Sequence, residues 1–120
     1  MSSPVQKVLS EMVRIPGVTA IFIVSKEGFL VEKSTTGTLN IDEDAVAAMI
    51  TATYGATTQL GEELELGKPE MTTLEFPGHY LLFHDMGENL LAVLADRSRA
   101  VLGRLRYEIK KQAPRIANML

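Results

Sequence analysis

Residues 15–30, IPGVTAIFIVSKEGFL, indicate the fold more clearly than any other stretch of this 120-residue chain. Val18–Ser25 is rich in β-branched and aromatic residues, which is typical of a buried strand. It leads into Ser25-Lys26-Glu27-Gly28, a predicted hairpin turn in which Gly28 can adopt positive φ. The chain then returns as a second strand over Phe29–Lys33. We therefore expect an antiparallel hairpin here.

Helical and strand patterns continue on both sides of this hairpin. A short helix, Pro4–Val13, is predicted before it, with Ser3 as the N-cap. The later elements are predicted as a helix, three strands and a final helix, over Asp42–Leu64, Met71–Phe76, Tyr80–Asp85, Asn89–Ala95 and Ser98–Leu120. We expect Asn40 to cap the long helix and Pro114 to bend or interrupt the last turn of the final one.

The order α-β-β-α-β-β-β-α predicts an α/β fold of the α+β type. Its five-stranded sheet should be mainly antiparallel, because short links join most of the strands, and helices should flank it. A chain of 120 residues is expected to form one domain over residues 1–120.

Composition excludes several classes of protein. The chain has no cysteine, so disulfides and thiolate metal sites are impossible. No apolar run reaches the roughly 20 residues that span a bilayer. Residues 1–7 lack the basic-then-apolar order of a secretory signal, so a cytoplasmic location is expected.

Catalytic and metal-binding patterns are weak. His79 and His84, the two histidines, lie five apart on a predicted strand and should face opposite ways, as partly buried, hydrogen-bonded side chains. The segment Gly61–Pro69 resembles a phosphate loop, but it carries three glutamates and has Pro69 where magnesium binding needs Ser or Thr. We expect no catalytic residue, no metal and no cofactor, and no nucleic-acid partner.

The long helix carries two different faces. One face should pack on the sheet; it consists of Val46, Met49, Ile50, Thr53, Tyr54, Thr57, Leu60 and Leu64. The other is made mostly of small residues: Ala45, Ala48, Ala52, Gly55, Ala56 and Gln59. This small-residue stripe favours close contact with a second helix, although alanines that merely favour helix formation are the alternative.

The strand after this helix supports the same interpretation. It carries no charge between Glu70 and Glu75 and follows a long connection, so it could form a sheet edge open to another chain. Together the stripe and the edge predict a two-fold dimer interface. Besides the stripe, the predicted interface includes Met71, Thr72, Thr73 and Leu74.

The C-terminal helix is basic. Residues 97–120 contain seven Lys or Arg and one acid, Glu108, whereas residues 1–96 have a net charge of −9. A solvated face that balances acidic sheet neighbours is the simpler explanation, and an acidic protein or an anionic membrane surface is the alternative. The predicted patch consists of Arg104, Arg106, Lys110, Lys111 and Arg115.

The whole pattern resembles the roadblock/LC7 family, in particular its prokaryotic MglB-like branch. The match rests on residues 15–30, on the acidic start and Ala-rich body of the middle helix, and on residues 90–94 with residues 102–108. This resemblance implies a profilin-like fold and a homodimer in which edge strands join and the middle helices pack side by side. It also implies a small Ras-like GTPase as partner, whose GTP hydrolysis some members stimulate without an arginine finger.

The sequence therefore favours a non-catalytic homodimeric regulator or scaffold that binds a small Ras-like GTPase. A plain adaptor in a motor or signalling complex is one alternative. A small-molecule sensor domain is another, and it would need a cavity with convergent polar groups.

Overall fold

The computed structural model describes residues 3–120, and its element order agrees with the predicted one. The helices are α1 (Pro4–Met12), α2 (Glu43–Glu63) and α3 (Leu102–Met119). The strands are β1 (Val18–Ser25), β2 (Leu30–Thr35), β3 (Met71–Glu75), β4 (His79–Asp85) and β5 (Asn89–Asp96). No helix within residues 3–120 is long and apolar enough to cross a membrane.

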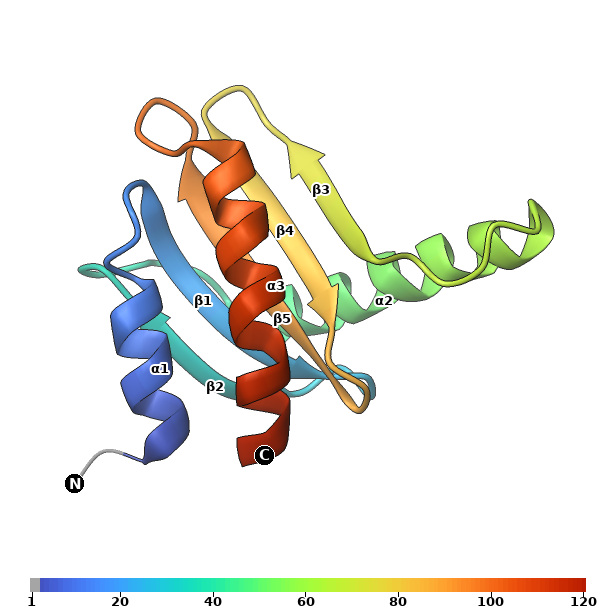
Figure 1. The fold of residues 1–120 in the computed structure, drawn as a ribbon, viewed down its shortest axis with the longest axis horizontal. Coiled ribbons are helices and arrows are strands. Elements are labelled where there is room, and N and C mark those ends of the chain that lie inside the picture. Colours follow the sequence, from blue (N-terminus) through green and yellow to red (C-terminus); the bar gives the residue numbers. More distant parts are fainter. Residues whose placement is uncertain (1–2) are drawn as a thin grey trace.

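The five strands form one sheet in the order β2-β1-β5-β4-β3, and every neighbouring pair is antiparallel (Figure 1). The hairpin turn between β1 and β2 is confirmed, with Gly28 at φ +97°. Strands β2 and β3 form the two edges. The predicted edge position of β3 is therefore confirmed.

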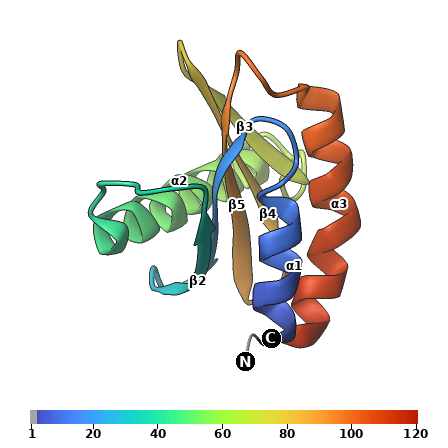
Figure 2. The same cartoon turned by 90° about the vertical axis from the view of Figure 1, so that its left-hand side faces the viewer.

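Helices cover both faces of the sheet. Figure 2 shows α1 and α3 side by side on one face and α2 on the other. One core cluster lies beneath α1 and α3 and contains Leu9, Ile21, Val93, Leu105 and Ile116. The second cluster lies beneath α2 and contains Phe22, Ile50, Tyr54, Phe83 and Leu90. Alternation along β1, β3, β4 and β5 supplies both clusters, because successive side chains point to opposite faces.

Two helix starts differ from the prediction. Helix α2 begins at Glu43 with Asp42 as its N-cap, because the Asp42 carboxylate accepts a hydrogen bond from the Ala45 N–H at 3.1 Å. The expected cap, Asn40, lies outside the helix. Helix α3 begins at Leu102, four residues later than predicted, after a turn in which Asp96 accepts hydrogen bonds from Ser98.

Pro114 does not interrupt the final helix, so that part of the prediction is wrong. Helix α3 continues through Pro114 to Met119. Ile116, beyond the proline, is fully buried in the core cluster under α1 and α3. Burial of such a side chain contributes about 1.5–3 kcal/mol, which offsets the hydrogen bond that proline removes.

Candidate functional site

The small-residue stripe of α2 faces away from the sheet. Ala48, Ala52, Gly55, Ala56 and Gln59 are exposed, and Ala45 is half-buried. On the opposite side of the helix, the buried side chains of Ala47, Ile50 and Tyr54 hold α2 against β1 and β2. The stripe is therefore an outward-facing surface of small side chains on an anchored helix.

Strand β3 lies close to this helix. It pairs with β4 through the register Met71↔His84 to Glu75↔Tyr80, and among residues 3–120 no strand pairs with its other side. Met71, Thr72, Thr73 and Leu74 are all half-buried. Leu74 faces the α2 side of the sheet, whereas Met71 packs against the cluster under α1 and α3. The four predicted strand residues therefore share an edge but not a face.

An apolar groove separates α2 from β3 and β4. Its volume is about 280 Å³, and its lining consists of Val46, Met49, Ile50, Thr53, Leu74, Phe76, Leu81 and Phe83. Met49 is 60% exposed and Phe76 is 48% exposed, so both leave apolar surface in contact with solvent. The sequence pattern did not reveal this groove, because its two walls come from segments that are far apart along the chain.

The predicted sheet-facing stripe of α2 is wrong in part. Met49, Leu60 and Leu64 were expected to be buried. Instead, the side chain of Met49 is 60% exposed, and those of Leu60 and Leu64 are each 57% exposed. Figure 1 shows the reason: the C-terminal half of α2 extends past the β3 edge, where no sheet lies beneath it. We call the exposed side chains of Leu60, Leu64 and Leu66 at this end the apolar tip.

A polar cluster joins α2 to the turns at one end of the sheet. The hydroxyl of Tyr54 donates a hydrogen bond to Asp85, and the Lys26 ammonium lies 2.9 Å from the same carboxylate. The backbone N–H of Gly87 also donates to Asp85, at 2.7 Å. The Lys26 ammonium lies 5.5 Å from the centre of the Tyr54 ring, within the range of a cation–π contact.

These contacts shift two pKa values. Burial, and then the hydrogen bond to Asp85, raises the pKa of Tyr54 to about 12. Burial alone would raise the pKa of Asp85, but hydrogen bonds from Tyr54, Gly87 and Lys26 together lower it. The cluster therefore stays as a protonated tyrosine and an ionised aspartate at neutral pH. These contacts connect α2 to the end of β4 and to the β1–β2 turn.

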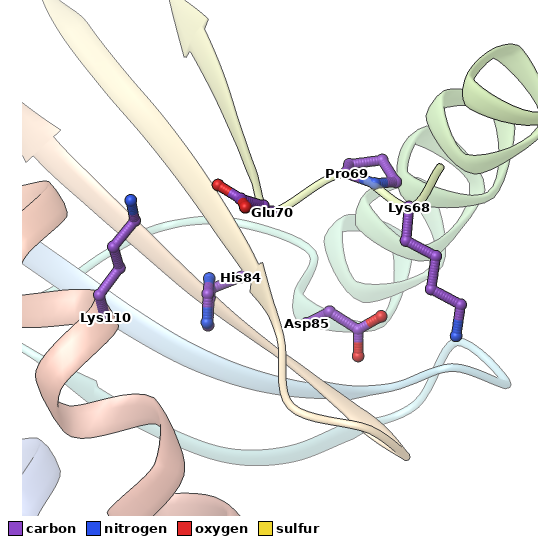
Figure 3. A pocket seen from close by; sticks show the side chains of 6 residues that line it. All are labelled: Lys68, Pro69, Glu70, His84, Asp85 and Lys110. Atoms are coloured by element: carbon purple, nitrogen blue, oxygen red, sulfur yellow. The ribbon is translucent and has the colours of Figure 1, made fainter. Parts of the chain in front are cut away.

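An open depression lies beside this cluster. Figure 3 shows its six lining side chains, which come from α3, from the end of β4 and from the segment before β3: Lys68, Pro69, Glu70, His84, Asp85 and Lys110. Its volume is about 630 Å³. Its charges are mixed, with two lysines and two carboxylates, so it does not favour one sign of ligand.

Neither histidine has the expected surroundings. His79 is exposed, and the Nδ1 atom of His84 is buried with no hydrogen-bond partner among residues 3–120. A hydrogen-bonded histidine was predicted at both positions, so this prediction is wrong. Within the same residues, no group of three or more His, Asp or Glu side chains is arranged to hold a metal ion.

The predicted basic patch lies on the outer side of α3. Arg104, Arg106, Lys110, Lys111 and Arg115 are all exposed. This patch and the α2 stripe lie on opposite sides of the sheet (Figure 2). The structure therefore divides the predicted site residues between two separate surfaces.

The fold described above agrees with the result of comparing the sequence with models of protein families. The family model that describes the Roadblock/LC7 domain matches residues 4–95. The chain belongs to the Roadblock/LC7 family. The match covers α1, α2, the first four strands and β5 except its last residue, and thus includes the stripe, the groove and the β3 edge.

The chain is similar in sequence to one further protein and in structure to two solved ones described here. An uncharacterized protein of Methanocaldococcus jannaschii, MJ0714, is 33% identical over 119 residues, which is 99% of this chain and 98% of that protein. A structure described as MglB with tetrameric arrangement is similar at a TM-score of 0.87 and 21% identity, over 96% of this chain and 86% of that one. The gliding protein MglB from Thermus thermophilus has the same TM-score at 20% identity, over 96% and 87%. At such identities the two structures establish the shared fold.

Proposed function

We propose that this Roadblock/LC7 protein is a non-catalytic homodimeric docking module that binds a small Ras-like GTPase on its α2 side. The observation that supports it best is the outward-facing stripe of small side chains on α2, in a chain whose β3 edge is also unpaired among residues 3–120. Small side chains let two helices approach closely, and an unpaired strand edge can pair with another chain. One of the similar structures is described as MglB with tetrameric arrangement, which supports the assembly of subunits that have this fold.

The apolar tip and the apolar groove complement each other in this dimer. Pairing of two β3 strands about a two-fold axis extends the projecting half of each α2 over the partner's sheet. Leu60 and Leu64 would then enter the partner's groove, where Met49 and Leu74 line the walls. Each copy supplies both surfaces, as a two-fold interface requires.

The dimer is tested with Ala52→Glu. Ala52 is exposed in the single chain, so the substitution leaves the fold of each chain intact, but it places an unpaired charge in the proposed interface. We expect the wild type to have the mass of a dimer and the variant that of a monomer by light scattering. Asn118→Glu is the matched control, because it adds the same charge at an exposed position of α3, and this variant should remain dimeric. A monomeric wild type at micromolar concentration would refute the assembly.

GTPase binding requires a separate experiment. A purified small Ras-like GTPase of the same organism, loaded with fluorescent GDP or with a fluorescent GTP analogue, is titrated with the dimer and followed by anisotropy. We expect binding that prefers one nucleotide state and is lost in Ala52→Glu but not in Asn118→Glu. Equal binding by all three proteins would place the contact away from α2.

The charge of α2 bears on how the GTPase would be affected. Helix α2 contains four acidic residues and no Lys or Arg, so it has no arginine to insert into a partner's active site. Stimulation would therefore act by rearranging the GTPase's own catalytic residues, and a plain adaptor would leave hydrolysis unchanged. The rate of GTP hydrolysis with and without the dimer distinguishes the two.

A further inference from the structure

The five cations on α3 have no carboxylate partners among residues 3–120. We call Arg104, Arg106, Lys110, Lys111 and Arg115 the basic face. The ion pairs found in this part of the chain join Lys26 to Asp85 and Lys33 to Glu43, and neither involves α3. Balance by acidic sheet neighbours, the simpler explanation from the sequence, therefore has no contact in the structure to support it. Positive side chains without a carboxylate partner create an electric field that attracts anions.

The helix presents these cations as a fixed array. Arg106 and Lys110 are four residues apart and share one flank, whereas Arg104, Lys111 and Arg115 share the other. Between the two flanks lies Tyr107, which is 62% exposed. The opposite side of α3 is fully buried, so the array cannot turn inward. From Arg104 to Arg115 the array extends along α3 for about 17 Å.

Charge is separated across the sheet. Helix α3 contains five basic residues and one acidic residue, whereas α2 contains four acidic residues and no basic residue. The two helices lie on opposite faces, as Figure 2 shows. An extended anionic surface would therefore attract the α3 side and repel the α2 side. The protein would be oriented by its own field.

We propose that the basic face of α3 binds the anionic headgroups of a lipid membrane surface. Its cations are spread along the exposed side of a helix, and Lys110 lines the open depression described above. A planar surface of uniform charge fits this arrangement. The amphipathic ring of Tyr107 is suited to the headgroup region. An interface with an acidic protein would normally have an apolar centre of complementary shape. This face has a single exposed aromatic ring, Tyr107, which is too little apolar surface for such a centre.

The inference stands without the proposed dimer, because each chain carries the whole face. If β3 pairs with a second β3 about an axis normal to the sheet, both basic faces lie on the same side. Both sets of cations would then face the membrane, and the two α2 helices would face away from it. Dimerisation would strengthen membrane binding through multivalency.

The test is co-sedimentation of the full chain with lipid vesicles. One set contains phosphatidylcholine alone, and the other contains phosphatidylcholine mixed with phosphatidylglycerol, both at about 0.1 M salt, where charges more than about 10 Å apart are largely screened. We expect binding to the anionic vesicles only, weakening as salt is raised. The triple variant Arg104→Gln/Lys110→Gln/Lys111→Gln should bind on the order of 100-fold more weakly, since each cation contributes a factor of about five.

Matched single variants control for total charge. Lys111→Gln should reduce binding about fivefold. Lys68→Gln removes one exposed cation outside the basic face and should leave binding unchanged. Circular dichroism checks that the variants fold.

Several outcomes would overturn the proposal. The first is a wild type that does not bind anionic vesicles. The second is a triple variant that binds them as tightly as the wild type, and the third is an equal loss of binding in Lys111→Gln and Lys68→Gln. Binding to polyglutamate but not to vesicles would assign the face to an acidic protein instead. The triple variant should remain a dimer by light scattering, and Ala52→Glu should still prefer anionic vesicles. The dimer proposal and the membrane proposal can therefore be refuted independently of each other.

Discussion

Gly17 joins α1 to β1 at a position that leaves no room for a side chain. Its φ is +90°, and a Cβ atom built there would lie 2.6 Å from the backbone nitrogen of Ala100. This contact is with backbone, so it cannot be relieved by a side-chain rotation. Sequence patterns do not reveal this neighbour, because Ala100 is 83 residues away from Gly17 along the chain.

We predict that Gly17→Ala lowers the free energy of unfolding by more than about 2 kcal/mol, because positive φ and a backbone clash act together. Gly37→Ala is the matched control: its φ is +77°, but no atom lies within 4 Å of the added Cβ. It should lose only about 1 kcal/mol, from φ alone. Urea denaturation measures both, and equal losses would show that Ala100 moves aside freely.

Tyr54 gives the protein a specific response to alkaline pH. Its pKa is about 12 in the fold, against about 10 for a free tyrosine. The folded state therefore holds the phenolic proton more tightly than the unfolded state does. The resulting stability is fully present below about pH 10 and is lost as the pH rises from about 10 to 12.

We predict that Tyr54→Phe unfolds more easily at neutral pH, by about 1–2 kcal/mol, because Asp85 loses a hydrogen bond. Between about pH 10 and 12 the variant should lose less stability than the wild type does. Denaturation curves recorded across this range measure the difference. Tyr107→Phe, at an exposed position, should follow the wild type, and a Tyr54→Phe curve parallel to the wild type would argue against the Asp85 contact.

At the scale of the element, α2 shows how a cap and a sheet determine a helix. Its N-terminal half is capped by Asp42 and packed on the sheet, whereas its C-terminal half projects beyond β3. The projecting end is closed by a turn in which Glu65 has φ +57° and the Leu66 N–H donates to the Gly61 carbonyl at 2.7 Å. A Cβ atom on Gly61 would clash with the carbonyl oxygen of Gly67, and Gly67 has φ +82°, so this closing segment needs both glycines.

We predict that Asp42→Ala lowers the free energy of unfolding by about 1 kcal/mol, because it removes the cap of α2 and one favourable charge at the helix N-terminus. Asn40→Ala should have little effect, since Asn40 lies before the cap. Thermal unfolding followed by circular dichroism compares the two. A larger loss in Asn40→Ala would restore the cap assignment made from the sequence.

At the scale of the whole molecule, the two sides of the sheet differ in the partners they suit. The α2 side carries small residues, an apolar groove and an apolar tip, which favour another protein surface. The α3 side carries cations over a closed core. One layer of sheet separates the two surfaces, so under the two proposals each surface could bind its own partner.

We predict that the melting temperature of the wild type rises by several degrees when protein concentration is raised about 100-fold, because a dimer that unfolds to monomers is stabilised by mass action. Ala52→Glu should melt at a temperature that does not depend on concentration. Calorimetry at several concentrations measures both. A wild type whose melting temperature stays constant would count against the dimer even if its mass were ambiguous.

The sequence by itself determined the element order, the β1–β2 hairpin and the small-residue stripe. Each depends on local periodicity or on a single turn residue such as Gly28, and both act over a few residues. The tertiary structure alone decided that Leu60 and Leu64 are exposed, because periodicity gives the apolar side of a helix but not the width of the sheet beneath it. It also decided the contact of Tyr54 with Lys26 and Asp85, because these residues come from three separate segments that meet only when the sheet is complete.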